Sequence, residues 1–541
     1  MHVLRASRIR QRKYRLRYAL AAMLYGALNG IAAAPVTGVE DAVTATTQAG
    51  RWRGQSRDGI QRFLGIYYGD DTRQRRFQAA LPEPPWTGTR DALHYAPRCP
   101  QAVTAQRAVD TTDMSEDCLS LNVWTPDVAD GSRRPVLVYF HGGGYANGSV
   151  NEPVYDGARL SRRGGVVVVT VNHRLNGFGF LDLSALDAER FADSGVVGML
   201  DLLLALQWVR DNIAAFGGDP ANVTIFGQSG GGAKCATLMA MPAARGLFHR
   251  VWTMSGQQIT GRRRANAEQT ARDVLQRLSA TPGRAAASID TLMTAPISAL
   301  MEAMRDGTWT PVVDGRLLPR DPFSPDAPPQ SAELPMVLGN THDETTLLIG
   351  RNEPTLFALQ WPQVAERLQH HVGQFMRELD AEDVVARYRE WYPAYSPSEV
   401  FFAASTAARS WKGMVLASDR RAAQGAPTWV YYLHWKSPQD GGRWGAPHTL
   451  DIPLVFDTVA ADPLTRDGGP AAQQIADQMS EALIQFARSG DPHHAGLPDW
   501  PRFTLPDRPA MIFQSEPVLM LDPRGAERRL FEPAAYLQPG T

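Results

Sequence analysis

The stretch Asn222-Val-Thr-Ile-Phe-Gly-Gln-Ser-Gly-Gly-Gly232 decides the fold, because its apolar run stops abruptly at a serine among small residues. Val223 to Phe226 have the character of a buried strand, and the stretch Ala233 to Met241 favours a helix. Between them lies G-x-S-x-G, the nucleophile elbow that holds a serine at strained backbone angles above a sheet edge. The two outer glycines relieve steric conflict in such a turn. A Gly-rich turn with an incidental serine is the alternative interpretation.

A second glycine-rich loop, His141-Gly-Gly-Gly144, directly follows the apolar run Pro135 to Phe140. It matches the oxyanion loop of enzymes that carry this elbow. In acyl transfer the carbonyl oxygen becomes negative, and backbone N–H groups of Gly143, Gly144 and Gly230 could converge on it. Each such donor stabilises the transition state by roughly 3 kcal/mol. The elbow and the oxyanion loop are two independent halves of one site. Their joint presence favours an acyl-transfer site over two unrelated glycine-rich turns.

The elbow serine, Ser229, needs an acid and a base, which follow it in that chain order in this type of site. Among the 12 histidines, His448 stands out because its loop leads into an apolar segment. For the acid, the segment after a predicted strand end offers both Asp343 and Glu344. Chemistry alone leaves these two neighbouring carboxylates open.

The order of apolar runs predicts a doubly wound α/β sheet. Runs that are apolar on both faces are typical of parallel strands covered by helices. A largely buried helix is expected from Gly198 to Phe216, ending before a glycine pair. The region from Gln61 to Pro100 is rich in turns, and we expect an extended surface segment there. Strands are expected at Leu119–Val123, Pro135–Phe140, Val166–Val171, Val223–Phe226, Val251–Met254, Met336–Leu338 and Thr428–Trp435.

The N-terminus is typical of a secretory signal. A basic region precedes an apolar run from Tyr18 to Leu28, and small residues follow at Ala32-Ala33-Ala34. We therefore predict a signal peptide at residues 1–34 and a single domain at 35–541, since no linker or repeat divides the 541-residue chain. An uncleaved anchor is the alternative; after signal removal we expect no stable membrane insertion. The protein is expected to be exported, to the periplasm or beyond the cell.

Charge and composition exclude several classes of function. The formal net charge is −1, and the first 34 residues hold seven basic and no acidic side chains, so the remainder carries −8. An acidic protein of this kind has no electrostatic basis for binding nucleic acid. The pair His493-His494 lacks neighbouring ligands at metal-site spacing. We therefore predict no metal and no other cofactor.

Three cysteines suit an exported protein with one disulfide and one spare thiol. Cys99 and Cys118 lie 19 positions apart, and closing such a loop would stabilise the fold by roughly 3 kcal/mol. Cys235 falls in the helix after the elbow, where a buried free thiol is expected.

From about Arg62 to the C-terminus, the chain resembles the type-B carboxylesterase family, which includes bacterial para-nitrobenzyl-type esterases and the cholinesterases. The resemblance rests on two long signatures and several short motifs, which occur in the same order as in the family. These are Glu116-Asp-Cys-Leu-Ser-Leu-Asn-Val123, Phe216-Gly-Gly-Asp-Pro-Ala-Asn-Val-Thr-Ile-Phe-Gly-Gln-Ser-Gly-Gly231, Asn172-His-Arg-Leu175, Ser255-Gly256, Pro311-Val-Val-Asp-Gly315 and Trp500-Pro501.

The resemblance implies an α/β-hydrolase fold with a central, mostly parallel sheet, flanking helices and long insertions that form a substrate gorge. It implies Ser229 as nucleophile, Glu344 as acid and His448 as base, with Ser255 close behind them. It also implies a disulfide between Cys99 and Cys118.

Two residues of the elbow depart from the family's pattern. Gln228 replaces the commoner glutamate before the serine, and Gly230 replaces the commoner alanine after it. Neither change removes a backbone N–H that the chemistry needs.

The predicted function is hydrolysis of small-molecule carboxylic esters through an acyl-enzyme intermediate. An amidase or lipase on the same fold is one alternative, because fold and triad do not fix the leaving group. A non-catalytic, cholinesterase-like binding protein is the other, although every triad position is filled here. The region between the elbow and His448, where pockets of this fold are generally lined, holds several aromatic residues, most of which are expected in the core. They are Trp309, Phe323, Trp361, Phe375, Trp391, Phe401 and Phe402.

Overall fold

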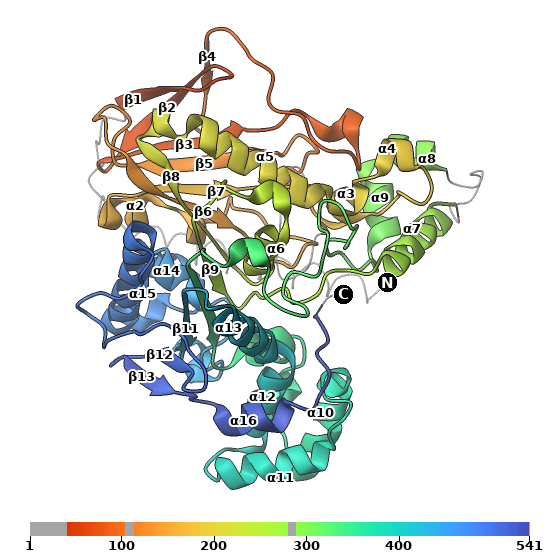
Figure 1. The fold of residues 1–541 in the computed structure, drawn as a ribbon, viewed down its shortest axis with the longest axis vertical. Coiled ribbons are helices and arrows are strands. Elements are labelled where there is room, and N and C mark those ends of the chain that lie inside the picture. Colours follow the sequence, from red (N-terminus) through yellow and green to blue (C-terminus); the bar gives the residue numbers. More distant parts are fainter. Residues whose placement is uncertain (1–40, 103–112, 280–287, 540–541) are drawn as a thin grey trace, which may run out of the picture. The chain divides into compact units, whose positions relative to one another are not determined.

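A thirteen-stranded sheet runs through the computed structural model, which describes residues 41–102, 113–279 and 288–539 (Figure 1). The predicted signal peptide lies outside these described residues. Ala42–Thr541 forms one compact unit. The strands are β1 (Asp41–Thr46), β2 (Arg51–Arg57), β3 (Ile60–Tyr67), β4 (Thr89–Asp91), β5 (Ser120–Thr125), β6 (Arg134–Phe140), β7 (Val167–Val171), β8 (Gly218–Gln228), β9 (Arg250–Met254), β10 (Met336–Thr341), β11 (Thr428–Leu433), β12 (Pro509–Phe513) and β13 (Val518–Leu521).

The middle of the sheet is parallel and its ends are antiparallel. The strand order is β1-β2-β3-β5-β7-β6-β8-β9-β10-β11-β12-β13, with β4 beside β2. Neighbours from β7 to β12 run parallel. The pairs β2–β3, β3–β5, β5–β7 and β12–β13 are antiparallel. The chain therefore has the predicted α/β-hydrolase architecture, extended at both edges of the sheet.

Helices cover both faces of the sheet. They are α2 (Ala158–Gly164), α3 (Asn176–Phe180), α4 (Ala188–Phe191), α5 (Val197–Asn212), α6 (Gly230–Ala240), α7 (Arg264–Ser279), α8 (Ile289–Thr294), α9 (Ile297–Met304), α10 (Val364–Val372), α11 (Ala381–Trp391), α12 (Pro397–Thr406), α13 (Lys412–Gln424), α14 (Asp451–Val455), α15 (Gly469–Ser489) and α16 (Gly525–Phe531). In Figure 1, α10, α11, α12 and α16 lie together at the lower end of the view.

Strand β6 shows how one sequence supplies two cores. Successive side chains of a strand point to opposite faces. Val136, Val138 and Phe140 enter a core that they share with α5, α6 and α13. Leu137 and Tyr139 enter the core on the other face, beneath α2 and α15. Because both faces are buried, the strand reads as a continuous apolar run rather than as an alternating one.

The strands expected from apolar runs are present as β5 to β11. The helix expected from Gly198 to Phe216 is α5, followed by a 3₁₀ turn at Ile213–Phe216. It ends at Gly217, whose φ of 75° places it in the left-handed region. A glycine adopts this conformation without steric cost, so it ends helices readily.

The expectation of a surface segment from Gln61 to Pro100 is wrong for the first part of this range, although residues 78–91 are exposed or partly exposed. Strand β3 lies there and pairs with β2 and β5. Phe63 and Ile66 in this strand are fully buried. The register of β3 against β5 shifts between these two residues. Such an irregularity breaks the two-residue period, which explains why the apolar pattern did not reveal the strand.

A disulfide joins Cys99 and Cys118, and Cys235 is free and buried. Both predictions for the cysteines are therefore confirmed. The crosslink ties the segment after β4 to the residues just before β5. A disulfide of this kind is typical of proteins that fold in an oxidising, exported environment.

Candidate active site

Ser229 lies in the sharp turn between β8 and α6. Its backbone has φ 56° and ψ −125°, which is unusual for a residue with a side chain. The Ser229 N–H donates to the carbonyl oxygen of Met254 on the neighbouring strand, at 2.8 Å. A Cβ at Gly227 would lie 2.4 Å from the carbonyl carbon of Gly231. A Cβ at Gly231 would lie 1.9 Å from the oxygen of Phe140. Only glycines allow this turn to pack so closely.

The glycine loop after β6 borders the same cavity as Ser229. Gly143 and Gly144 have φ values of 86° and 62°, in the region that favours glycine. Within the described residues, the N–H groups of these two glycines donate to no acceptor. Gly230 is the first residue of α6, where an N–H has no acceptor within the helix. Three backbone donors are thus left for an external oxygen.

The loop approaches the elbow so closely that Gly230 is required at its position. A Cβ at Gly230 would lie 2.0 Å from the carbonyl oxygen of Gly144. Alanine, the commoner residue here in related elbows, would force the loop to move. The replacement of the usual alanine by Gly230 therefore matches the close approach of the Gly144 loop.

Glu344 and His448 contact each other beside Ser229. Glu344 follows β10, and His448 lies in the loop between β11 and α14. One oxygen of the buried Glu344 carboxyl pairs with Nδ1 of His448. The other accepts from Ser255 Oγ at 2.5 Å, from the Asn340 amide at 3.0 Å and from the Thr341 N–H at 2.9 Å. These contacts leave no oxygen of this carboxyl without a partner.

The charge of Glu344 is well compensated. Burial raises the pKa of this carboxyl, but the charge of His448 and the hydrogen bonds from His448, Ser255 and Thr341 outweigh burial. The net pKa lies below the ordinary value for glutamate. Glu344 is therefore an ionised carboxylate at neutral pH.

Asp343, the neighbouring carboxylate, points elsewhere. It pairs with Nδ1 of His342 at 2.8 Å and accepts from the Ala446 N–H at 2.8 Å. It thus ties the end of β10 to the loop that carries His448. Of the two carboxylates that the sequence left open, the structure brings Glu344 to the histidine.

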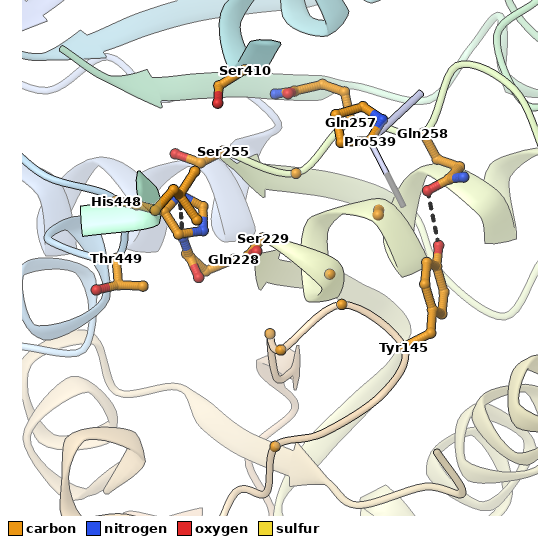
Figure 2. A pocket seen from close by; sticks show the side chains of 18 of the residues that line it. Tyr145, Gln228, Ser229, Ser255, Gln257, Gln258, Ser410, His448, Thr449 and Pro539 are labelled. Carbon is orange, nitrogen blue, oxygen red and sulfur yellow. Dashed lines mark hydrogen bonds between the residues drawn. The ribbon is translucent and has the colours of Figure 1, made fainter. Parts of the chain in front are cut away.

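The Gln228 side chain lies against the His448 ring. Its amide nitrogen lies 3.2 Å from Nε2 of His448, beside Ser229 (Figure 2). No hydrogen bond reaches Ser229 Oγ from the described part of the chain. The Gln228 amide nitrogen also lies 3.5 Å from Nδ1, so the amide faces both ring nitrogens rather than one of them. The contact of Nδ1 with the Glu344 carboxylate fits an imidazole whose proton is on Nδ1.

Asp451 is a buried carboxyl next to this group that the sequence analysis missed. It begins α14, one helical turn after His448, and its side chain is fully buried. Tyr431 donates its hydroxyl proton to Asp451 at 3.2 Å. Burial, followed by repulsion from Glu344, raises the pKa of Asp451 to about 7. The available signal was a carboxylate three residues after His448 in an otherwise apolar segment.

A cavity of about 510 Å³ opens above these groups. Ser229, His448 and the loop glycines form its floor. Of the aromatic residues proposed from the sequence, only Trp309 lies among the described residues that line it. Apolar walls come from Tyr145, Val154, Tyr155, Trp309, Leu348 and Ile452, and polar ones from Gln257, Gln258, Arg409, Ser410, Tyr536 and Gln538. No group of three or more His, Cys, Asp or Glu in the described ranges could hold a metal ion.

The end of the chain forms one wall of this cavity. Gln538 accepts a hydrogen bond from the Ile259 N–H at 2.7 Å and another from the Tyr536 hydroxyl at 2.9 Å. Its amide donates to the Gln257 carbonyl oxygen at 3.2 Å. No motif in the sequence marked these residues, because the wall depends on how the last turns of the chain pack across the fold.

Comparison with known proteins places this geometry in one family. Residues 41–529 match the model of the carboxylesterase family. The para-nitrobenzyl esterase of Bacillus subtilis is 32% identical over 90% of this chain and 98% of that protein. The phenmedipham hydrolase of Pseudarthrobacter oxydans is 32% identical over 87% and 95%. A carboxylesterase structure from Geobacillus stearothermophilus superposes with a TM-score of 0.78, at 33% identity, over 90% and 99% of the chains.

Replacing Asp451 with asparagine should stabilise the protein more as the pH rises. The pKa of Asp451 is about 7 in the folded protein and about 3.9 in an unfolded chain. Between these values the unfolded chain releases the proton while the folded protein keeps it, so the wild type loses stability as pH rises through this window. Asparagine does not titrate and keeps that stability. Thermal midpoints at about pH 5 and about pH 8 measure the effect; an equal difference between the two proteins at both values would contradict it.

Proposed function

The chain belongs to the carboxylesterase family, and we propose that Ser229, His448 and Glu344 are the catalytic triad of this carboxylic ester hydrolase. The supporting observation is the buried Glu344–His448 pair beside a serine in a strained elbow. Backbone donors without acceptors border the same cavity. A nucleophile, a base with its orienting acid and an oxyanion site are the groups that acyl transfer needs.

In the first half of the reaction, Ser229 Oγ attacks the ester carbonyl carbon and His448 Nε2 takes the hydroxyl proton. The N–H groups of Gly143, Gly144 and Gly230 stabilise the negative oxygen of the tetrahedral intermediate. The intermediate collapses, the ester C–O bond breaks, and the alcohol leaves with the proton from His448. Water then attacks the acyl-enzyme by the same route, which releases the carboxylic acid and restores Ser229.

Glu344 holds the His448 ring and stabilises the imidazolium that forms in each half-reaction. Because its pKa is low, it stays ionised while the histidine gains and loses a proton. Ser255, Asn340 and Thr341 replace the water that burial removes from this carboxylate. Ser255 is thus a positioning residue that acts through Glu344.

Gln228 lies beside the ring nitrogen that must accept the serine proton. Its amide nitrogen is 3.2 Å from Nε2 of His448 and 3.5 Å from Nδ1. The serine hydroxyl must come within hydrogen-bond distance of Nε2 before the proton can pass. Catalytic hydrogen bonds are often long or misaligned before substrate binds, so we infer that substrate brings Ser229 Oγ to Nε2.

The cavity suits a small ester with an aromatic or apolar portion. Its volume of about 510 Å³ is in the range of small-molecule sites. Tyr145 and Trp309 provide apolar surface next to the nucleophile. One relative is named for para-nitrobenzyl esters, which contain an aromatic ring.

We further infer that the protein acts outside the cytoplasm as a single domain over residues 35–541. The Cys99–Cys118 disulfide supports an oxidising compartment. A basic, then apolar, N-terminus supports export through a signal peptide at residues 1–34.

The Ser229→Ala variant should lose ester hydrolysis almost completely. Without the nucleophile only the oxyanion donors and substrate binding remain, and kcat should fall by roughly six powers of ten. Hydrolysis of para-nitrophenyl acetate measures this, with Ser489→Ala, an exposed serine at the end of α15, as the matched control. If Ser229→Ala kept near-normal turnover while folded, the nucleophile would lie elsewhere.

Glu344→Gln and Asp343→Asn form an isosteric pair that tests the acid. Glu344→Gln removes the charge that orients His448, and kcat should drop by about four powers of ten. Asp343→Asn loosens the loop at Ala446, so its main effect should be on the thermal midpoint rather than on kcat. A larger loss of kcat in folded Asp343→Asn than in Glu344→Gln would reassign the acid.

Cell fractions of a bacterial host should contain the mature protein outside the cytoplasm. Mass spectrometry should find a chain that begins near Ala34 to Thr37, with Cys99 and Cys118 joined in one crosslinked peptide pair. A full-length cytoplasmic product with both thiols free would refute export.

A further inference from the structure

Arg409 lines the active-site cavity but takes no part in the ester chemistry described above. It lies in the π-helical turn Ala407–Trp411, between α12 and α13. Single π-helical turns inside helices occur frequently at functional sites. The cavity that Arg409 borders is the one that contains Ser229 and His448. A cationic residue therefore borders the space that the substrate must enter.

The guanidinium of Arg409 is poorly paired. Its side chain donates one hydrogen bond, to Ser410 Oγ at 3.2 Å, although a guanidinium has five N–H donors. Across the described residues, no Asp or Glu oxygen lies within ion-pair distance of it. The side chain is half-buried, so water cannot solvate it fully.

Other buried arginines in this protein show what full pairing looks like. Arg174 binds the Asp201 carboxylate with two nitrogens. Arg524 pairs in the same way with Glu527. Arg421 donates to Thr428 and to several backbone carbonyl oxygens. Arg409 differs from all three because it borders a cavity and donates a single hydrogen bond, to Ser410.

The Glu344 carboxylate, which acts electrostatically on Arg409, cannot be the missing partner. Burial lowers the pKa of Arg409, while Glu344 and Tyr536 act in the opposite direction. Both oxygens of Glu344 are already engaged, by His448 on one side and by three donors on the other. Arginine nevertheless stays charged in proteins. The cation thus has unmet capacity for an anion.

The surroundings of Arg409 are polar on one side of the nucleophile. Ser410 and Gln257 lie on the same side of Ser229 in Figure 2. Gln257 turns its amide toward the Asn340 side chain at 3.3 Å. Tyr536 and Gln538 bond to each other in the adjacent wall. Among the described residues that line the cavity, the acidic ones are Glu152 and Asp462, which flank the short turns Pro153–Tyr155 and Val459–Ala461. At Arg409 itself, a substrate carboxylate would meet Ser410, Gln257, Tyr536 and Gln538, which carry no negative charge.

We propose that Arg409 binds a carboxylate carried by the substrate, so that the enzyme favours hemiesters of dicarboxylic acids. The proposal rests on the proposed function, because it assumes that Ser229 attacks the ester in this cavity. A guanidinium binds a carboxylate through two parallel hydrogen bonds. The contact is strengthened where water is partly excluded. One end of the substrate would lie at Ser229 and the other at Arg409.

Two esters of matched shape test this proposal. Mono(para-nitrophenyl) glutarate ends in a carboxylate, and para-nitrophenyl isoheptanoate ends in a neutral branch of the same shape. The readout is the ratio of their kcat/KM values, after subtraction of spontaneous hydrolysis. Arg409→Met should lower this ratio by roughly tenfold to hundredfold, because this is the effect expected when a hydrogen bond between two charged groups is lost. Arg409→Lys keeps the positive charge but cannot form the two parallel hydrogen bonds of a guanidinium. Its ratio should lie between those of wild type and Arg409→Met.

Arg387→Met is the matched control, because Arg387 is exposed on α11 and pairs with Glu390 at the surface. It removes one positive charge and should leave the ratio as in the wild type. An unchanged ratio in both Arg409 variants would overturn the proposal. This includes an equal loss of kcat/KM for both esters, which would mean that Arg409 acts through Glu344. If wild type hydrolysed neither ester, the proposed function itself would fail. That result is distinguishable from an unchanged ratio in the Arg409 variants, which requires an active wild type.

Discussion

The close packing of backbone around Ser229 is the constraint on which the rest of the site depends. The serine holds a left-handed conformation because Gly227 and Gly231 allow the strand, the turn and the helix to pack without a clash. The same requirement reaches the loop after β6, since Gly230 lies against the oxygen of Gly144. Such strain persists only where the surrounding structure enforces it. Ser229 and the glycines Gly143, Gly144 and Gly230 consequently line the same cavity.

The parallel sheet explains why residues far apart in sequence meet. Gly143, Ser229, Glu344 and His448 all follow strands whose carboxyl ends lie at one edge, namely β6, β8, β10 and β11. Ligands of open α/β sheets bind at this edge. Burial would make an isolated carboxylate costly there, and the four partners of Glu344 offset that cost. The proposed site therefore combines a rigidly held serine with a preorganised carboxylate.

The sequence was most informative where function depends on the backbone. Glycines must occupy the elbow and the loop, so both could be recognised as motifs in the sequence. Local pattern could not choose between Asp343 and Glu344, because the choice depends on which way two adjacent side chains leave one turn. Strand β3 escaped notice because its register shifts between Phe63 and Ile66. The walls formed by Arg409 and the chain end come from tertiary packing, for which no local signal exists.

The most direct test of the account is to locate the covalent adduct of a phosphonylating reagent. A phosphonate is attacked as an ester is, but its adduct hydrolyses slowly, so it marks the nucleophile. Intact mass and peptide mapping, followed alongside residual esterase activity, should show one adduct per chain on Ser229, formed in step with the loss of activity. An adduct on another residue, or inactivation that leaves Ser229 unmodified, would contradict the assignment of the elbow serine.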